Sequence, residues 1–114
     1  MNNYNTPLPY QTKSGIETGG KKVVVVKIGQ GGNVIDRINS SINAGETLFI
    51  RAENGDIRIN EWNPVNETNG RNIYLGGNGT RNIILRHGQC ASFIKMDGGN
   101  GIEKCAYQLV SISN

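Results

Sequence analysis

The chain has 114 residues and a mass of 12.4 kDa, which leaves room for one small domain and little more. Its formal net charge is +3, but the 12 Lys and Arg are scattered rather than clustered, which argues against specific nucleic-acid binding. No apolar run approaches the roughly 20 residues that span a bilayer, and the first residues lack a signal-peptide pattern, so we expect synthesis in a cytoplasm and no membrane partner.

Residues 1–20 contain two prolines and two tyrosines and show no apolar period. This composition predicts an extended N-terminal arm, followed by a folded domain over 21–114. The arm is either a disordered terminus or a segment that becomes ordered against a neighbouring subunit. In the second case the candidate docking residues are Tyr4, Pro7, Leu8, Pro9 and Tyr10.

The run KKVVVVKIGQGGNVI at 21–35 looks like a strand that leads into a phosphate-binding turn. A P-loop, however, requires a Lys-Ser or Lys-Thr pair after its last glycine, and this run has none. In the dinucleotide fingerprint G-x-G-x-x-G, Gly29 and Gly31 fill the first two places, but Val34 fills the third. We therefore predict a strand over 22–28 that is buried on both faces, a sharp turn, and no nucleotide site.

The segment 33–42 reads NVIDRINSSI. Its apolar residues fall at helical spacing, which predicts one short helix. They are Val34, Ile35, Ile38 and Ile42. The β-branched, Asn and Ser residues of this segment disfavour a helix, so an irregular crossover is the alternative.

Residues 46–62 contain two alternating apolar and polar runs around Asn54 and Gly55, the strongest short signal for a β-hairpin. A two-residue turn there places Arg51 opposite Arg58. The core face of the hairpin then carries Leu48, Ile50, Ala52, Ile57 and Ile59. The other face carries Phe49, Arg51, Arg58 and Trp62. Aromatic residues and arginine anchor interfaces, so this second face is a candidate interface or ligand surface, unless another part of the domain covers it.

From residue 71 the chain repeats once, as RNIYLGGNG at 71–79 and RNIILRHGQ at 81–89. The second copy predicts another hairpin with its turn at His87 and Gly88, and a last strand is predicted over 106–112. With 16 Gly and 16 Asn to supply tight turns, the chain is predicted to be all-β: a small antiparallel, jelly-roll-like β-sandwich of about seven strands.

The sequence predicts a protein without enzyme activity, cofactor or metal. His87 is the only histidine and lies at a predicted turn, and the acidic residues show no metal-loop spacing. A nucleophilic Cys90 would need a base directed at it. Cys90 and Cys105 are expected to be reduced packing residues, with a disulfide in an air-exposed particle as the alternative.

The C-terminal run GNGTRNIILRHGQCASFIKMDGGNGIEKCAYQLVSIS resembles the end modules of bacteriophage fibre and capsid-decoration proteins. The matching features are an apolar strand at 83–85, a Gly-Gln hairpin tip at 88–89, a strand of mixed polarity at 92–95, a Gly-rich loop at 98–101 and a last strand at 107–111. The run NAGETLFIRAENGDIRI is similar to the same kind of virion module. Tyr107 stands where tryptophan is usual, and the two cysteines also depart from the pattern.

The resemblance implies a small all-β subunit that forms a homotrimer and attaches to a capsid or other virion protein through its N-terminal segment. The expected function is that of a non-enzymatic structural protein of the virion surface, a head-fibre or capsid-decoration subunit. The alternative is a carbohydrate- or receptor-binding module of a phage fibre, with a host-surface glycan as its partner.

Overall fold

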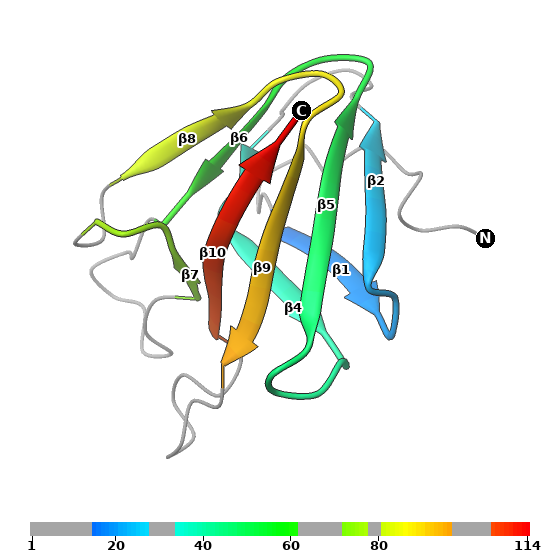
Figure 1. Ribbon diagram of the computed structural model, residues 1–114, viewed down its shortest axis with the longest axis vertical. Helices are drawn as coiled ribbons and strands as arrows, with labels where there is room; N and C mark the ends of the chain where they lie inside the picture. Colours follow the sequence, from blue (N-terminus) through cyan, green and yellow to red (C-terminus); the bar gives the residue numbers. More distant parts are fainter. Residues whose placement is uncertain (1–14, 28–33, 62–71, 78–80, 97–105) are drawn as a thin grey trace.

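The computed structural model describes residues 15–27, 34–61, 72–77, 81–96 and 106–114 (Figure 1). These residues form β1 (Gly15–Gly19), β2 (Val23–Lys27), β3 (Val34–Ile35), β4 (Arg37–Ser40), β5 (Thr47–Glu53), β6 (Ile57–Asn60), β7 (Ile73–Tyr74), β8 (Asn82–Leu85), β9 (Cys90–Met96) and β10 (Ala106–Ser113). The all-β prediction is confirmed. The predictions of about seven strands and of purely antiparallel pairing are wrong, because ten strands form three mixed sheets. None of the described residues belongs to a helix that could cross a membrane.

Residues 34–40 form two short strands in place of the predicted helix. β3 pairs in parallel with β6, and β4 pairs in parallel with β1. Ile35 and Ile38 are buried in the core. β-branched residues lose side-chain freedom in a helix and fit a pleated sheet, and here they gain strand partners from distant parts of the chain. The apparent helical spacing arises from two strands separated at Asp36.

The largest sheet has the strand order β2-β5-β9-β10-β7. β5, β9 and β10 pair antiparallel in its middle, while β2 runs parallel to β5 and β7 runs parallel to β10. The predicted valine strand is β2, in which Val24 and Val26 are buried but Val23 is exposed. The prediction that both faces of this strand are buried is therefore wrong, and only its even-numbered side packs against the core.

β5 and β6 do not form the predicted hairpin. β5 belongs to the five-stranded sheet, and β6 belongs to the three-stranded sheet of order β3-β6-β8. The turn at Asn54 and Gly55 has positive φ at both residues, 67° and 144°, and carries the chain from one sheet to the other as an arch. Figure 1 shows β6 and β8 side by side, apart from β5 and β9. The burial pattern is the same in an arch as in a hairpin, so alternation alone does not separate the two.

The predicted hairpin at His87 and Gly88 is a second arch, since β8 lies in the three-stranded sheet and β9 in the five-stranded sheet. β9 pairs with β5 and β8 pairs with β6, both antiparallel, so the two arches are stacked. Their turns are also joined by backbone hydrogen bonds. Gly88 N–H donates to the Ala52 carbonyl at 2.8 Å, and Ala52 N–H donates to the Gln89 carbonyl at 3.1 Å.

All three sheets contribute to one hydrophobic core. The five residues predicted for the core face of residues 46–62 are all fully buried in it. They pack with Val24, Val26, Ile35, Ile38, Leu85, Ala91, Phe93 and Tyr107, among others. Each large side chain removed from water in this way contributes about 1.5–3 kcal/mol before the entropic cost of ordering the chain.

The two-stranded sheet of β1 and β4 extends the packed region into residues 15–19. Ile16 and Thr18 on β1 are buried. Packing therefore begins within the segment predicted as the arm, because β1 finds a parallel partner in β4. Residues 1–14, with the candidate docking residues Tyr4, Pro7, Leu8, Pro9 and Tyr10, lie outside the described residues.

Asn72 joins the two-stranded and five-stranded sheets. Its side chain accepts from the Ile38 N–H at 2.6 Å and donates to the Ile38 carbonyl at 3.0 Å. Its own carbonyl accepts from the Tyr107 N–H at 2.8 Å. One asparagine thus holds the edge of β4 against the beginning of β10.

Candidate interaction surface

Exposed apolar residues form a row across the outer face of the five-stranded sheet. The strand register places Val23 of β2 beside Phe49 of β5, Phe49 beside Ser92 of β9, and Ser92 beside Ser111 of β10. A bulge in β10 inserts Val110 next to Ser111. We call these five residues the outer row. Val23 and Val110 are each 61% exposed and Phe49 is 39% exposed, whereas Val24, Ile50 and Phe93 on the opposite face of these strands are fully buried.

Two small residues, Ser92 and Ser111, occupy the middle of the outer row. The Oγ atoms of Ser92 and Ser111 are 2.9 Å apart, and Ser92 Oγ also lies 3.4 Å from the Ser111 carbonyl oxygen. The two hydroxyls therefore bond each other. Buried polar groups are costly only when they lack hydrogen-bond partners. An apolar surface can therefore cover these two hydroxyl groups at little cost in free energy.

Two ion pairs lie near the outer row. Arg51 Nε lies 3.9 Å from Glu53 Oε1, and both residues follow Phe49 on the outer side of β5. Lys22 Nζ lies 2.8 Å from Glu46 Oε2. The hydrogen bond from Lys22, followed by one from the Asn43 N–H, holds the pKa of the Glu46 carboxyl below its usual value. Lys22 and Glu46 adjoin Val23 and Thr47, so alternation places both on the other side of the sheet from the outer row, where Glu46 also lies near Lys95.

The predicted interface residues are not brought together as one face. Phe49 and Arg51 lie on the outer side of the five-stranded sheet, where both are exposed. Arg58 lies in the three-stranded sheet, between Val34 and Ile84 in the strand register, and donates to Asn82 Oδ1 at 3.1 Å. The predicted pairing of Arg51 with Arg58 is wrong because β5 and β6 belong to different sheets. Trp62 lies outside the described residues.

Val23 and Val110 are the surface residues that the sequence did not reveal. The four-valine run indicated a strand, but not that this strand lies at a sheet edge with one face open. For Val110, alternation gives two answers, because a bulge separates Leu109 from Ser111. Counted forward from Tyr107 and Leu109, Val110 falls on the outer side, but counted back from Ile112, which pairs with Ala91, it falls on the inner side.

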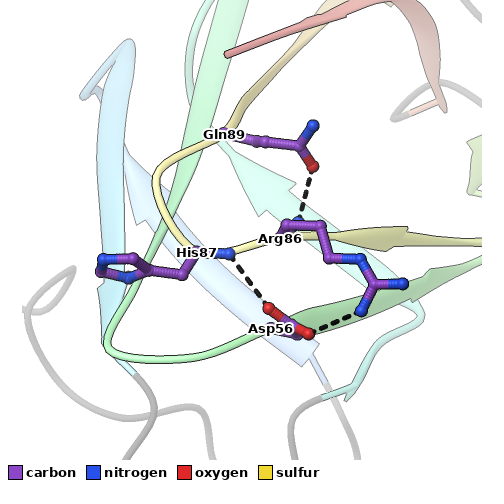
Figure 2. A network of polar contacts seen from close by, with 4 residues as sticks. All are labelled: Asp56, Arg86, His87 and Gln89. Atoms are coloured by element: carbon purple, nitrogen blue, oxygen red, sulfur yellow. Dashed lines mark hydrogen bonds and ion pairs between the residues drawn. The ribbon is translucent and has the colours of Figure 1, made fainter.

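A polar network ties the turns of the two arches together (Figure 2). Asp56 accepts from the His87 N–H at 3.0 Å through Oδ1 and from Arg86 Nη1 at 2.8 Å through Oδ2. The hydrogen bond from Arg86 and then that from His87 lower the pKa of the Asp56 carboxyl. His87 Nδ1 accepts from the Asn54 N–H at 2.9 Å. The side chain of His87 is thus engaged in holding a turn, as its predicted position at a turn suggested.

Glu61 forms a second, fully buried network. Its Oε1 accepts from the N–H groups of Leu75 at 2.7 Å and Gly77 at 3.3 Å, and its Oε2 accepts from the Arg81 N–H at 3.3 Å. Arg81 Nη1 also donates to the Leu75 carbonyl at 2.7 Å. A Cβ at Gly77 would collide with Glu61 Oε2 and with Arg81 Cβ, so the carboxylate and the loop fit only because residue 77 is glycine. The sequence offered only the Gly76-Gly77 pair as a signal for this loop.

A third cluster connects the end of β4 to β9 and β10. Lys95 Nζ donates to the carbonyls of Ile42 at 2.7 Å and Ser40 at 3.2 Å. The Ser40 hydroxyl and the Tyr107 hydroxyl are 2.5 Å apart, and Lys95 Nζ lies 5.9 Å from the centre of the Tyr107 ring. These groups satisfy backbone carbonyls and each other, so the cluster holds strands together.

Cys90 carries a free, half-buried thiol beside Arg51 in the strand register, and burial raises its pKa. Cys105 lies outside the described residues. Among the residues that the structure describes, no group of three or more His, Cys, Asp or Glu side chains could hold a metal ion. The outer row is therefore the strongest candidate for a functional surface in the described part of the chain.

Comparison with known proteins gives no match to a family model, a curated protein or a solved structure.

Proposed function

We propose that this chain is a non-enzymatic structural subunit of a bacteriophage particle, a head-fibre or capsid-decoration protein that assembles as a homo-oligomer on the virion surface. The observation that carries the proposal is the outer row, in which Val23, Phe49 and Val110 are exposed on β2, β5 and β10 of the sheet whose other face contributes to the core. Exposed apolar residues gathered on one face favour a protein contact.

The described side chains support an assembly module. The networks around Asp56, Glu61 and Lys95 hold turns and strand ends together, and they leave the outer face of the five-stranded sheet open. The two stacked arches fit a jelly-roll-like β-sandwich, in which the five-stranded and three-stranded sheets are the two layers. This layered fold is part of the proposal.

The proposed partners of this chain come from its resemblance to phage fibre and decoration modules. It implies a homotrimer that is made in the host cytoplasm and attached to a capsid or other virion protein through the arm, with Tyr4, Leu8 and Tyr10 as anchors. A domain of this size also gains stability when copies bury surface against each other.

The proposal is tested by the mass of the purified full chain and by its binding to capsids. We expect light scattering to give an oligomeric mass. We also expect the chain to cosediment with capsids of the virus whose genes flank its own, and Tyr4→Ala combined with Tyr10→Ala to reduce that binding. A monomer at high concentration, together with capsid binding that is absent or unchanged in the double variant, would refute the proposal.

A carbohydrate- or receptor-binding module is the second candidate, favoured by the exposed Phe49 beside Arg51 on an open sheet face. An aromatic ring next to a cation can stack on a sugar and bind its hydroxyl or carboxyl groups. Binding to a glycan array that Phe49→Ala abolishes, without loss of thermal stability, would support it. Absence of binding to every glycan would exclude the classes tested.

A further inference from the structure

We propose that the tips of the two stacked arches form a pH-dependent switch, in which protonation of the His87 ring releases the turn at Asn54 and Gly55 and leaves the rest of the fold in place. The contact that breaks is the hydrogen bond from the Asn54 N–H to His87 Nδ1, 2.9 Å long. It joins the tip of one arch to the tip of the other and does not involve the outer row. The switch therefore does not depend on whether the chain assembles.

The hydrogen bond requires a neutral imidazole ring. A neutral ring has one nitrogen that accepts and one that donates, whereas both nitrogens of a protonated ring donate. Because Nδ1 is the acceptor, the single ring proton of neutral His87 lies on Nε2. A second proton at Nδ1 points at the N–H of Asn54, so the contact changes from a hydrogen bond into a repulsion.

The turn at Asn54 depends on this bond. Among the described residues, Asn54 is the one non-glycine residue with a positive φ, 67°, and Gly55 follows with a φ of 144°. A left-handed backbone is unfavourable for a residue with a side chain, although asparagine tolerates it better than most. The bond to His87 is the one hydrogen bond of Asn54 within the described part of the chain. Its loss therefore favours other conformations of the turn.

The His87 ring is exposed, so a proton can reach it without any opening of the core. Histidine is the side chain that ordinarily changes charge between about pH 5 and pH 8. Two charged side chains lie beside it, Asp56 and Arg86, which bond each other at 2.8 Å. A protonated ring is attracted by the Asp56 carboxylate and repelled by the Arg86 guanidinium.

The neighbouring strands also bring polar and charged residues to this end of the molecule. On β5, Glu53 Oε1 lies 3.9 Å from Arg51 Nε, and Lys27 of β2 lies beside Glu53 in the strand register. After β10, Asn114 Oδ1 accepts from Gln89 Nε2 at 2.8 Å. Within the described part of the chain, none of these residues forms a hydrogen bond or ion pair with the imidazole ring.

Other contacts keep the arches stacked when the ring is protonated. Asp56 accepts from the backbone N–H of His87 at 3.0 Å, which a ring proton does not alter. The backbone hydrogen bonds from Gly88 to Ala52 and from Ala52 to Gln89 are equally independent of the ring charge. Protonation therefore changes the conformation of one turn and not the pairing of the strands.

The decisive experiment is an NMR titration of the full chain from about pH 7.5 to about pH 5. The ring resonances of His87 follow its protonation, and the amide resonances of Asn54 and Gly55 follow the turn. As the ring is protonated, we expect the protection of the Asn54 N–H against hydrogen exchange, corrected for the intrinsic effect of pH, to fall about fivefold, the effect of losing one exposed hydrogen bond. The amide chemical shifts of Ile50 and Ala91, which pair in the core strands, should stay constant.

Two matched variants assign the response to the ring. His87→Gln keeps a neutral acceptor and removes the titration, so the Asn54 amide should no longer respond to pH. Asp56→Asn removes the neighbouring carboxyl and keeps the ring, so the response should remain. The amide spectrum shows whether each variant is folded. An Asn54 amide that is unchanged while the His87 ring titrates overturns the inference, and so does a response that persists in His87→Gln or disappears in Asp56→Asn.

Discussion

The carboxylate of Glu61 lies fully buried and accepts hydrogen bonds from three backbone N–H groups, those of Leu75, Gly77 and Arg81. The described parts of this loop have no strand partner between β7 and β8, so the side chain takes the place that a neighbouring strand would take. An ionised carboxylate has acceptor capacity on both oxygens, and hydrogen bonds to a charged group are stronger than neutral ones. Glu61 therefore stabilises the fold, although an acidic residue in the sequence would be expected at the surface.

We expect Glu61→Gln to lower the free energy of unfolding by about 1–3 kcal/mol, because the amide NH₂ group would face the Arg81 N–H, a second donor. Urea unfolding measures this as a lower midpoint with an unchanged slope. The matched control is Glu53→Gln, which removes only a 3.9 Å contact to Arg51 at the surface and should change the free energy by less than about 0.5 kcal/mol. Equal effects of the two substitutions would contradict the role assigned to Glu61.

At the scale of single residues, the sequence predicts well which side chains are buried, but poorly which strand lies beside each of them. Alternation predicts that Leu48, Ile50 and Ile57 lie in the core, and all are fully buried. It also predicts correctly that Phe49 and Arg51 lie on the opposite side of their strand from Leu48 and Ile50. The prediction that Arg58 shares their face is wrong, because it assumes that the two strands beside a tight turn pair with each other. Which face a residue occupies is encoded locally, but which strand lies beside it is not.

At the scale of elements, the two arches explain the main topological errors. Asn54-Gly55 and His87-Gly88 are tight turns in both readings, and only the rotation of the chain after the turn distinguishes a hairpin from an arch. The stacking of the two arches on each other favours the arch over the hairpin. Each arch gives its two strands to two sheets, and the second arch supplies an antiparallel partner in each. The turns are then held by contacts between residues 30 or more apart in sequence: the Asp56 side chain accepts from Arg86, and the His87 ring accepts from the Asn54 backbone N–H.

Asp56 makes the stacked arches sensitive to acid. Because its pKa is lowered in the folded state by Arg86 and the His87 N–H, its ionised form stabilises the fold above the unfolded-state pKa of about 3.9. That contribution is lost as the pH falls through the lower folded-state pKa. We expect Asp56→Asn to reduce the unfolding midpoint at pH 7, and we expect the difference from the wild type to shrink below about pH 4.

Unfolding curves between pH 2 and pH 7 measure this difference, and the lowered pKa of Glu46 affects both proteins alike. Arg86→Gln removes one of the two partners of Asp56 and leaves the His87 N–H, so it should show the same pH dependence with a smaller loss than Asp56→Asn. A gap between wild type and Asp56→Asn that stays constant down to pH 2 would show that the carboxylate charge does not stabilise the arches.

At the scale of the whole molecule, parallel pairing between distant strands is what the sequence could not predict. β1 with β4, β2 with β5, β3 with β6 and β7 with β10 all run parallel. A parallel pair cannot be closed by a tight turn, so no local signal marks it. The all-β class followed from glycine and asparagine content and from short alternating runs. The number of sheets and their strand order followed from long-range packing alone.

Such pairing predicts slow folding for a chain of this size. Loop-closure entropy must be lost before the parallel partners meet, and folding rates fall as the separation of contacting residues rises. We expect refolding from urea in milliseconds to seconds, measured by stopped-flow fluorescence. Glu61→Gln serves as a comparison, because a loop residue should mainly speed unfolding rather than slow refolding. Refolding on the microsecond timescale would contradict the strand pairing described for β1 to β6.

The side-chain amide of Asn72 has a consequence for a protein present in many copies. By occupying both the N–H and the carbonyl of Ile38, it imitates one peptide group of a missing strand. An extended segment from another molecule that approached the edge of β4 would find that position already filled, and uncapped sheet edges are where aggregation by strand addition begins. At this edge, Asn72 therefore acts as a terminator of sheet growth and directs association toward side-chain contacts rather than backbone ones.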